Sequence, residues 1–90
     1  MTFSSQQFTL GTGVATRIVD ARSNWQKIII HNQEKSSGRY IFLGGSNVSE
    51  ANGVHIDHSE TEHIDLMPGA EIWATTNYDN LNCGVIRQIL

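Results

Sequence analysis

Short apolar runs separated by turn residues organise this chain, most clearly over residues 27–74. The runs are rich in β-branched and aromatic side chains, which are stiff at χ1 and pack well on a pleated surface. Glycine and asparagine punctuate them at spacings of roughly ten residues, as in small antiparallel proteins. The pattern predicts an all-β fold: a single small antiparallel β-sandwich or jelly-roll-like barrel of seven to eight short strands over residues 1–90.

The strongest predicted strand covers residues 25–32 and contains three consecutive isoleucines, Ile28, Ile29 and Ile30. Successive side chains of a strand point to opposite faces, so this strand is apolar on both sides. One face meets the core of the domain. We expect the other face to be covered as well, by an arm, a loop or a neighbouring subunit.

The first seven residues are rich in Thr, Ser and Gln, with Phe3 among them. Such a segment is either frayed or an extended N-terminal arm, and Phe3 and Phe8 favour an arm that docks elsewhere. Further along, residues 33–39 read as a polar hairpin loop. Pro68 and Gly69 predict a tight type II turn, because proline presets φ and glycine accepts the positive φ.

The size and cysteine content limit how the domain is stabilised. A chain of 90 residues buries only about 60–65% of its unfolded surface, so its stability should be modest without further support. Cys83 is the single cysteine, which excludes an intramolecular disulfide and a thiolate zinc cage. Oligomerisation is then the simplest remaining support.

The charge distribution argues against several partners. A formal charge of -3 does not suit a nucleic-acid binder, which needs clustered Lys and Arg. Residues 1–40 carry five basic and two acidic side chains, whereas residues 41–90 carry one basic and seven acidic. Either strands from both halves interleave, or copies contact each other through opposite charges. No apolar run has the length of a membrane span and no secretory signal is visible, so we expect synthesis in the cytosol.

One cluster resembles a metal site: His55, His58 and His63 lie among acidic residues. Imidazole and carboxylate suit Zn²⁺, Mn²⁺ or Fe²⁺ if the two strands that carry them adjoin. Each of these residues alternates with an apolar one, however, which is typical of a solvated sheet face. We predict no metal and no cofactor; if the histidines meet a neighbouring subunit, assembly should respond to pH.

No other pattern indicates catalysis. Gly44, Gly45 and Ser46 are followed by neither a phosphate-loop Lys nor a helix, so they read as a turn. We therefore predict that the protein is not an enzyme. Aromatic residues could instead line a sugar-stacking groove, a second class of function; the candidates are Tyr40, Phe42, Trp73 and Tyr78, with Trp25 as a further one.

Four segments resemble small β-sandwich virion proteins of tailed bacteriophages. They are Ile-Ile-His-Asn at 29–32, Ile-Phe-Leu-Gly-Gly-Ser-x-Val at 41–48, Asn-Gly at 52–53 and Pro-Gly-x-x-Ile-Trp-Ala at 68–74. Together they cover about half of the chain and consist of turn glycines and strand apolar residues. The resemblance is more specific for a fold than for a particular role.

The resemblance implies a structural protein of the virion, made in the bacterial cytoplasm. The favoured role is a capsid decoration or cement protein, expected as a homotrimer that clamps adjacent major capsid protein subunits through its arm and sheet edges. The alternatives are a tail, neck or fibre-attachment protein and a carbohydrate- or receptor-binding module. The predicted partner-binding residues are Phe3, Phe8, Ile29 and Trp73, with neither nucleic acid nor membrane as a partner.

Overall fold

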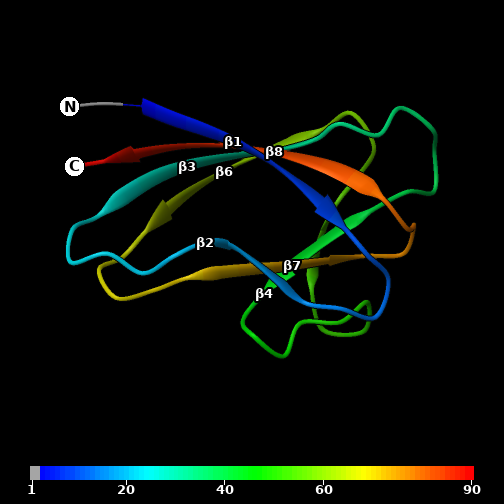
Figure 1. Cartoon of the computed structure of the whole chain (residues 1–90), viewed down its shortest axis with the longest axis horizontal. Coiled ribbons are helices and arrows are strands. Elements are labelled where there is room, and N and C mark those ends of the chain that lie inside the picture. The colour runs from blue at the N-terminus through cyan, green and yellow to red at the C-terminus, as the bar shows by residue number, and fades with distance from the viewer. Residues whose placement is uncertain (1–2) are drawn as a thin grey trace.

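The computed structural model describes residues 3–90 and shows two four-stranded antiparallel sheets packed face to face (Figure 1). The described residues form eight strands and no helix, which confirms the predicted all-β fold and a small β-sandwich. The strands are β1 (Phe3–Leu10), β2 (Thr16–Val19), β3 (Gln26–Asn32), β4 (Ile41–Gly44), β5 (Val54–Ile56), β6 (Thr61–Leu66), β7 (Ile72–Thr76) and β8 (Leu81–Ile89).

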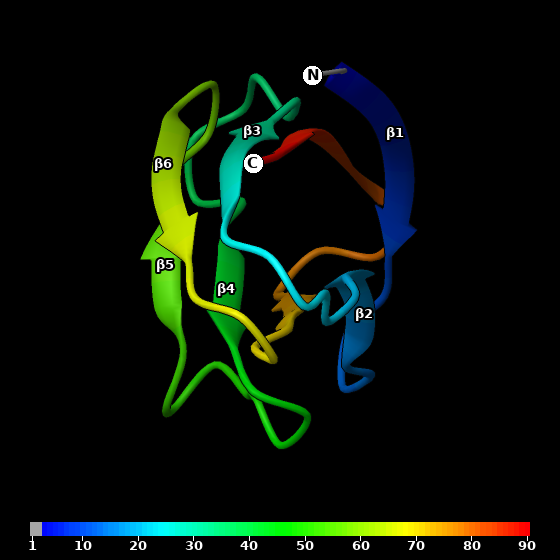
Figure 2. The ribbon, with the colours of Figure 1, turned by 90° about the vertical axis from the view of Figure 1, so that its left-hand side faces the viewer.

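The first sheet has the strand order β1-β8-β3-β6 and the second has the order β2-β7-β4-β5. Figure 2 shows β6 above β5 at one side of the sandwich and β1 above β2 at the other. Each sheet takes strands from both halves of the sequence. The opposite net charges of the two halves are therefore mixed in space, as the first of the two alternatives expects.

The core lies between the two sheets and follows the alternation of each strand. In β3, Ile28 and Ile30 are buried, whereas Ile29 between them is half-buried on the outer side. Leu43 and Ala74 are neighbours in the second sheet and both belong to the same core cluster. The prediction that the strand of three isoleucines is apolar on both faces is confirmed.

The expected N-terminal arm is part of the first sheet. Phe3–Leu10 pairs with β8 in unbroken register, from Phe3 opposite Gln88 to Leu10 opposite Leu81. The expectation of an arm over residues 1–7 is thus wrong for residues 3–7, and residues 1 and 2 lie outside the described residues. The physical reason is that β8 would have an unpaired edge without this segment. An extended segment that pairs there gains a ladder of backbone hydrogen bonds.

Residues 33–39 do not form a hairpin loop, because β3 and β4 belong to different sheets. Asn32 is fully buried, and its side chain fixes the connection that crosses from β3 in the first sheet to β4 in the second. Its side-chain amide donates hydrogen bonds to the carbonyl oxygens of Arg39 and Ile56, at 3.0 and 3.1 Å, and its Oδ1 accepts one from the backbone N–H of Glu34 at 3.0 Å. A polar turn sequence alone does not distinguish a hairpin from a crossover.

The turn at Pro68 has the predicted geometry. Gly69 has a φ of 82°, and the N–H of Ala70 donates to the carbonyl oxygen of Met67 at 3.2 Å. Positive φ at this third turn position explains why glycine occupies it. The turn joins β6 of the first sheet to β7 of the second.

Candidate docking surface

The outer side of the first sheet carries exposed apolar side chains at its centre. It consists of the strand positions that alternate with the core positions, and we call it the bare face. Its members by strand are Phe3, Ser5 and Gln7 on β1, Ile86 and Gln88 on β8, Lys27, Ile29 and His31 on β3, and Thr61, His63 and Asp65 on β6.

The centre of the bare face is apolar. Ile29 and Ile86 lie directly opposite each other on β3 and β8, and Ile86 is 41% exposed. Two shallow hollows, of about 400 and 310 Å³, both include these two isoleucines in their lining. Phe3, which is 69% exposed, lines the second hollow. These side chains form a wide, shallow apolar depression rather than an enclosed cavity.

Three further apolar side chains extend the bare face beyond the ends of its strands. Trp25 and Leu90 continue the pairing of β3 with β8 by one residue, since the N–H of Leu90 donates to the carbonyl oxygen of Trp25 at 2.9 Å, and Met67 directly follows β6. All three are about half-exposed. With Phe3 and Ile86, they make five of the eight large exposed apolar side chains found in residues 3–90. Exposed apolar side chains gathered on one face are typical of interaction sites, so this face is the candidate.

The rim of the bare face is polar and hydrogen-bonded. His31 Nδ1 lies 2.9 Å from Thr61 Oγ1, and Gln7 Nε2 donates to Gln33 Oε1 at 2.8 Å. Lys27 and Asp65 are cross-strand neighbours of opposite charge. An apolar centre with a polar rim of low net charge is the usual anatomy of a protein–protein interface.

The structure brings two of the four predicted partner-binding residues onto the bare face, Phe3 and Ile29. Phe8 points to the inner side of β1, half-buried against the core. Trp73 lies on the second sheet, and its indole N–H donates to Glu71 Oε1 at 3.0 Å. The four residues therefore do not form one surface.

Four residues on or beside this surface are not among the predicted partner-binding residues: Trp25, Met67, Ile86 and Leu90. A signal existed for Ile86, because Val85 and Ile86 are consecutive apolar residues, as in the strand of three isoleucines. For Trp25 and Leu90, only the pairing of β3 with β8 shows that they share a face with Phe3.

The histidine cluster is not assembled. His55 lies on β5 in the second sheet and His63 on β6 in the first, so their strands do not adjoin. His55 Nε2 lies 3.2 Å from Asp57 Oδ1, and its ring packs edge-on against Tyr40. Over the described residues, no group of three or more His, Cys, Asp or Glu side chains could hold a metal ion.

The aromatic candidates for a sugar-binding groove are also dispersed. Tyr40 and Phe42 pack edge to face on the second sheet, with ring centroids 6.2 Å apart. The guanidinium of Arg39 lies 3.8 Å from the centre of the Tyr78 ring. Trp25 is on the first sheet. The three hollows on the first sheet and between β1 and β2 include none of these side chains in their lining.

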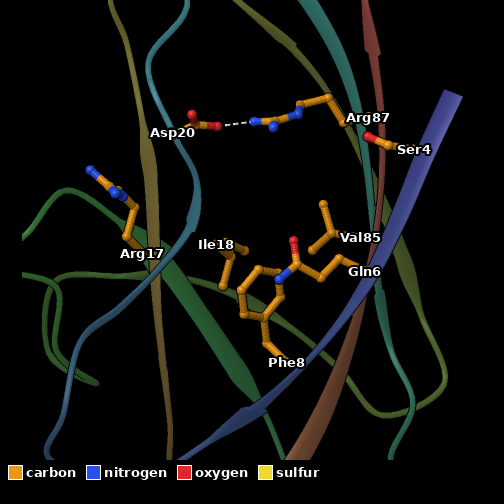
Figure 3. Close-up of a pocket in the computed structure, with 8 residues that line it drawn as sticks. All are labelled: Ser4, Gln6, Phe8, Arg17, Ile18, Asp20, Val85 and Arg87. Carbon is orange, nitrogen blue, oxygen red and sulfur yellow. Dashed lines mark hydrogen bonds and ion pairs between the residues drawn. The ribbon is translucent and has the colours of Figure 1, made fainter. Parts of the chain in front are cut away.

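A different hollow, of about 310 Å³, lies between β1 and β2 at the side where the sandwich opens (Figure 3). Asp20 and Arg87 point toward each other across it and form a hydrogen-bonded ion pair that joins the two sheets. The hydrogen bond from Arg87 is the main reason why the pKa of Asp20 lies below its ordinary value. Ser4 and Gln6 of β1 also line this hollow.

Comparisons of the chain with protein-family models, curated protein sequences and solved structures found no significant match. The part of the chain that the structure describes has no helix long and apolar enough to cross a membrane. The bare face is therefore the feature from which a function is best inferred.

Proposed function

We propose that this protein is a non-enzymatic structural component of a tailed-phage virion, most specifically a capsid decoration protein that docks onto the shell through its bare face. One observation carries the proposal: of the eight large exposed apolar side chains in residues 3–90, five lie on this sheet face or directly beyond the ends of its strands. Binding of a complementary surface removes these apolar side chains from water, which lowers the free energy.

The energetics suit a repeated structural contact. Burial of apolar surface contributes about 25 cal/mol per Å², and an ordinary specific interface buries about 800 Å² on each partner. Lost translational, rotational and side-chain freedom offsets most of this gross gain, so the net gain for one copy is modest, but a symmetric shell offers the same contact at many equivalent sites. Many small contributions can then stabilise a large assembly.

The four sequence segments that resemble phage virion proteins support the choice of assembly. They fall on β3, on β4 with the loop after it, on residues 52–53 before β5, and on the turn before β7 with the first three residues of that strand. Their glycines and apolar residues belong to the framework of the fold. The assignment to a virion depends on this resemblance, whereas the assignment of the bare face as a docking surface depends on exposure and register.

Binding to capsids tests the proposal. Capsids of the phage that encodes the chain, assembled without it, are incubated with the purified protein and separated by sedimentation. We expect the wild-type protein to co-sediment at many copies per capsid. Ile86→Asp should reduce binding at least about tenfold, because a charge would be buried in the apolar centre.

Val14→Asp is the control, because Val14 is an exposed apolar residue, 58% against 41% for Ile86, and lies outside the sheet faces. This variant should bind like the wild-type protein. Wild-type protein that ignores capsids overturns the decoration role, and equal binding of the two variants overturns the bare face as the docking surface. Binding at low copy number to necks or tails would instead assign the protein to that part of the virion.

A further inference from the structure

The four outer strands of the two sheets differ in how they are protected against pairing with another chain. β5 is only three residues long, and β2 has four residues with a register irregularity between Arg17 and Val19. β6 is longer but carries Glu62, His63 and Asp65. Short length, irregularity and charge are the usual devices that keep a sheet edge unpaired.

β1 has none of these devices. Its eight residues, Phe-Ser-Ser-Gln-Gln-Phe-Thr-Leu, include no charged residue, no glycine and no proline, and its register with β8 is unbroken. Residues 3–7 are all exposed. Figure 2 shows β1 at the outer edge of its sheet, with its side away from β8 open. Among the strands of residues 3–90, β1 is thus the longest and least protected edge, a row of backbone groups without a strand partner.

We propose that β1 pairs antiparallel with β1 of a second copy of this chain, which joins two first sheets into one sheet of eight strands. A second copy is the occupant that the strand itself favours. Because β1 is uncharged, two identical strands meet without like-charge repulsion, and an antiparallel pair of identical strands is closed by a two-fold axis. The polar side chains Ser5, Gln6 and Gln7 can hydrogen-bond across the junction.

The register of this strand pair is limited by the requirement that the two sheets keep the same side outward. Directly opposite residues of an antiparallel pair point to the same side, so outward residues must oppose outward residues. Leu10 is fully buried within its own domain, which leaves Phe3–Thr9 for pairing. The two-fold axis then passes between Gln6 and Gln6 of the second copy, and Ser5 lies opposite Gln7 of the second copy.

The pairing places the bare faces of both copies on the same side of the extended sheet. The axis is perpendicular to the sheet, so Ile29 and Ile86 of each copy face the same direction. This placement doubles the surface available for docking, and that benefit rests on the proposed function. The pairing itself does not rest on it. A two-fold edge contact also favours a dimer over the homotrimer that the resemblance implies.

Disulfide trapping tests the register. Opposite residues of an antiparallel pair have Cα atoms about 4.5–5.5 Å apart, within the range that a disulfide spans. Gln6→Cys should therefore form a covalent dimer when oxidised glutathione accepts the two electrons and two protons. The native Cys83 does not compete, since it is buried and burial raises the pKa of its thiol to about 12. Glu62→Cys, on the inner side of the opposite edge, should remain monomeric under the same conditions.

Charge placement provides a second test with a matched control. Ser5→Lys with Gln7→Lys puts two pairs of like charges directly across the junction, and should shift the dimer toward monomer by at least about tenfold in Kd. The control is His63→Lys with Thr61→Lys, which adds two lysines at the opposite edge. Ser5 and His63 lie in one row of the sheet, and Gln7 and Thr61 lie in the next.

Sedimentation equilibrium between about 10 μM and 1 mM measures the association, because a single strand junction is narrower than a standard interface. Circular dichroism checks that each variant is folded. The inference is overturned if the wild-type protein is monomeric throughout this range, if both cysteine variants crosslink equally, or if the two lysine pairs have the same effect. Failure to bind capsids with an intact dimer would instead reject only the proposed function.

Discussion

Strand alternation places apolar side chains on the outer faces of both sheets, but these side chains are covered on the second sheet and exposed on the first. On the second sheet, Phe42 is only 8% exposed, because residues 45–53 fold over it and bring the buried Val48 against that face. Thr75 on the same face is covered as well, and its hydroxyl donates to the carbonyl oxygen of Gly11 at 3.3 Å. The chain covers this face with its own connections.

No connection covers the outer face of the first sheet in residues 3–90, where Phe3 and Ile86 stay exposed. Since both sheets place apolar side chains outward, the difference lies in the loops and not in the strands. Apolar residues on the covered face contribute to the stability of the monomer. Apolar residues on the bare face contribute to binding, and only when another molecule covers them. Substitutions on the two faces should therefore affect different quantities, monomer stability on one and binding on the other.

The largest expected effect is on the covered face. Phe42→Ala should lower the free energy of unfolding by about 3–5 kcal/mol, because it removes a buried aromatic side chain and leaves a cavity under the loop. Urea denaturation followed by circular dichroism measures this loss. A loss below about 1 kcal/mol would show that the loop does not bury Phe42 in solution, and the comparison between the two faces would fail.

Gly53→Ala tests how closely the loop contacts the covered face. A Cβ atom at Gly53 would lie 2.7 Å from Cβ of Phe42 and 3.0 Å from the carbonyl oxygen of Ser49, so the backbone must shift. We expect a loss of about 1–3 kcal/mol in the same denaturation experiment. Gly45→Ala is the control, since its nearest neighbour would be the flexible side chain of Asn47 at 3.6 Å; it should cost clearly less.

A smaller effect concerns the ion pair between the sheets. Asp20→Asn should lower stability at pH 7 by about 1 kcal/mol or less, because the pair is partly exposed and screened. The pKa of Asp20 is lower in the folded protein than in the unfolded chain. Its stabilisation is therefore complete above about pH 4, the unfolded value, and is lost as the pH falls through the folded pKa.

Denaturation curves at pH 7 and at successively lower pH values below 4 measure this dependence. The stability difference between the wild-type protein and Asp20→Asn should shrink as the pH falls. Glu50→Gln serves as the control, because Glu50 is exposed and has no ion pair within residues 3–90. A difference that is independent of pH would mean that Asp20 is not held by Arg87.

The smallest effect on stability is expected at the centre of the bare face. Ile86→Thr keeps a β-branched side chain on the strand and removes exposed apolar surface. The free energy of unfolding should therefore change by no more than about 0.5 kcal/mol. Binding of a hydrophobic fluorescent dye to the folded protein should nevertheless decrease. A stability loss comparable to that of Phe42→Ala would show that the two faces do not differ.

The sequence by itself determined the local features of this protein: the all-β class, most strand positions, the turn at Pro68 and Gly69, and an apolar strand with two sides. Each depends on residues close together in the chain, since alternation and turn chemistry act over a few residues. The candidate surface was only half predictable. Phe3 and Ile29 were expected at a docking site, whereas Phe8 and Trp73 lie elsewhere.

Only the tertiary structure decided which strands adjoin and which face remains uncovered. Period-two alternation states which residues of one strand share a side, but it does not state that β3 lies beside β8 rather than β4. That choice set Ile86 beside Ile29, placed residues 3–7 in the sheet and separated His55 from His63. It depends on pairings between distant segments, whose free energy is shared over the whole core and is not encoded in any single run of residues.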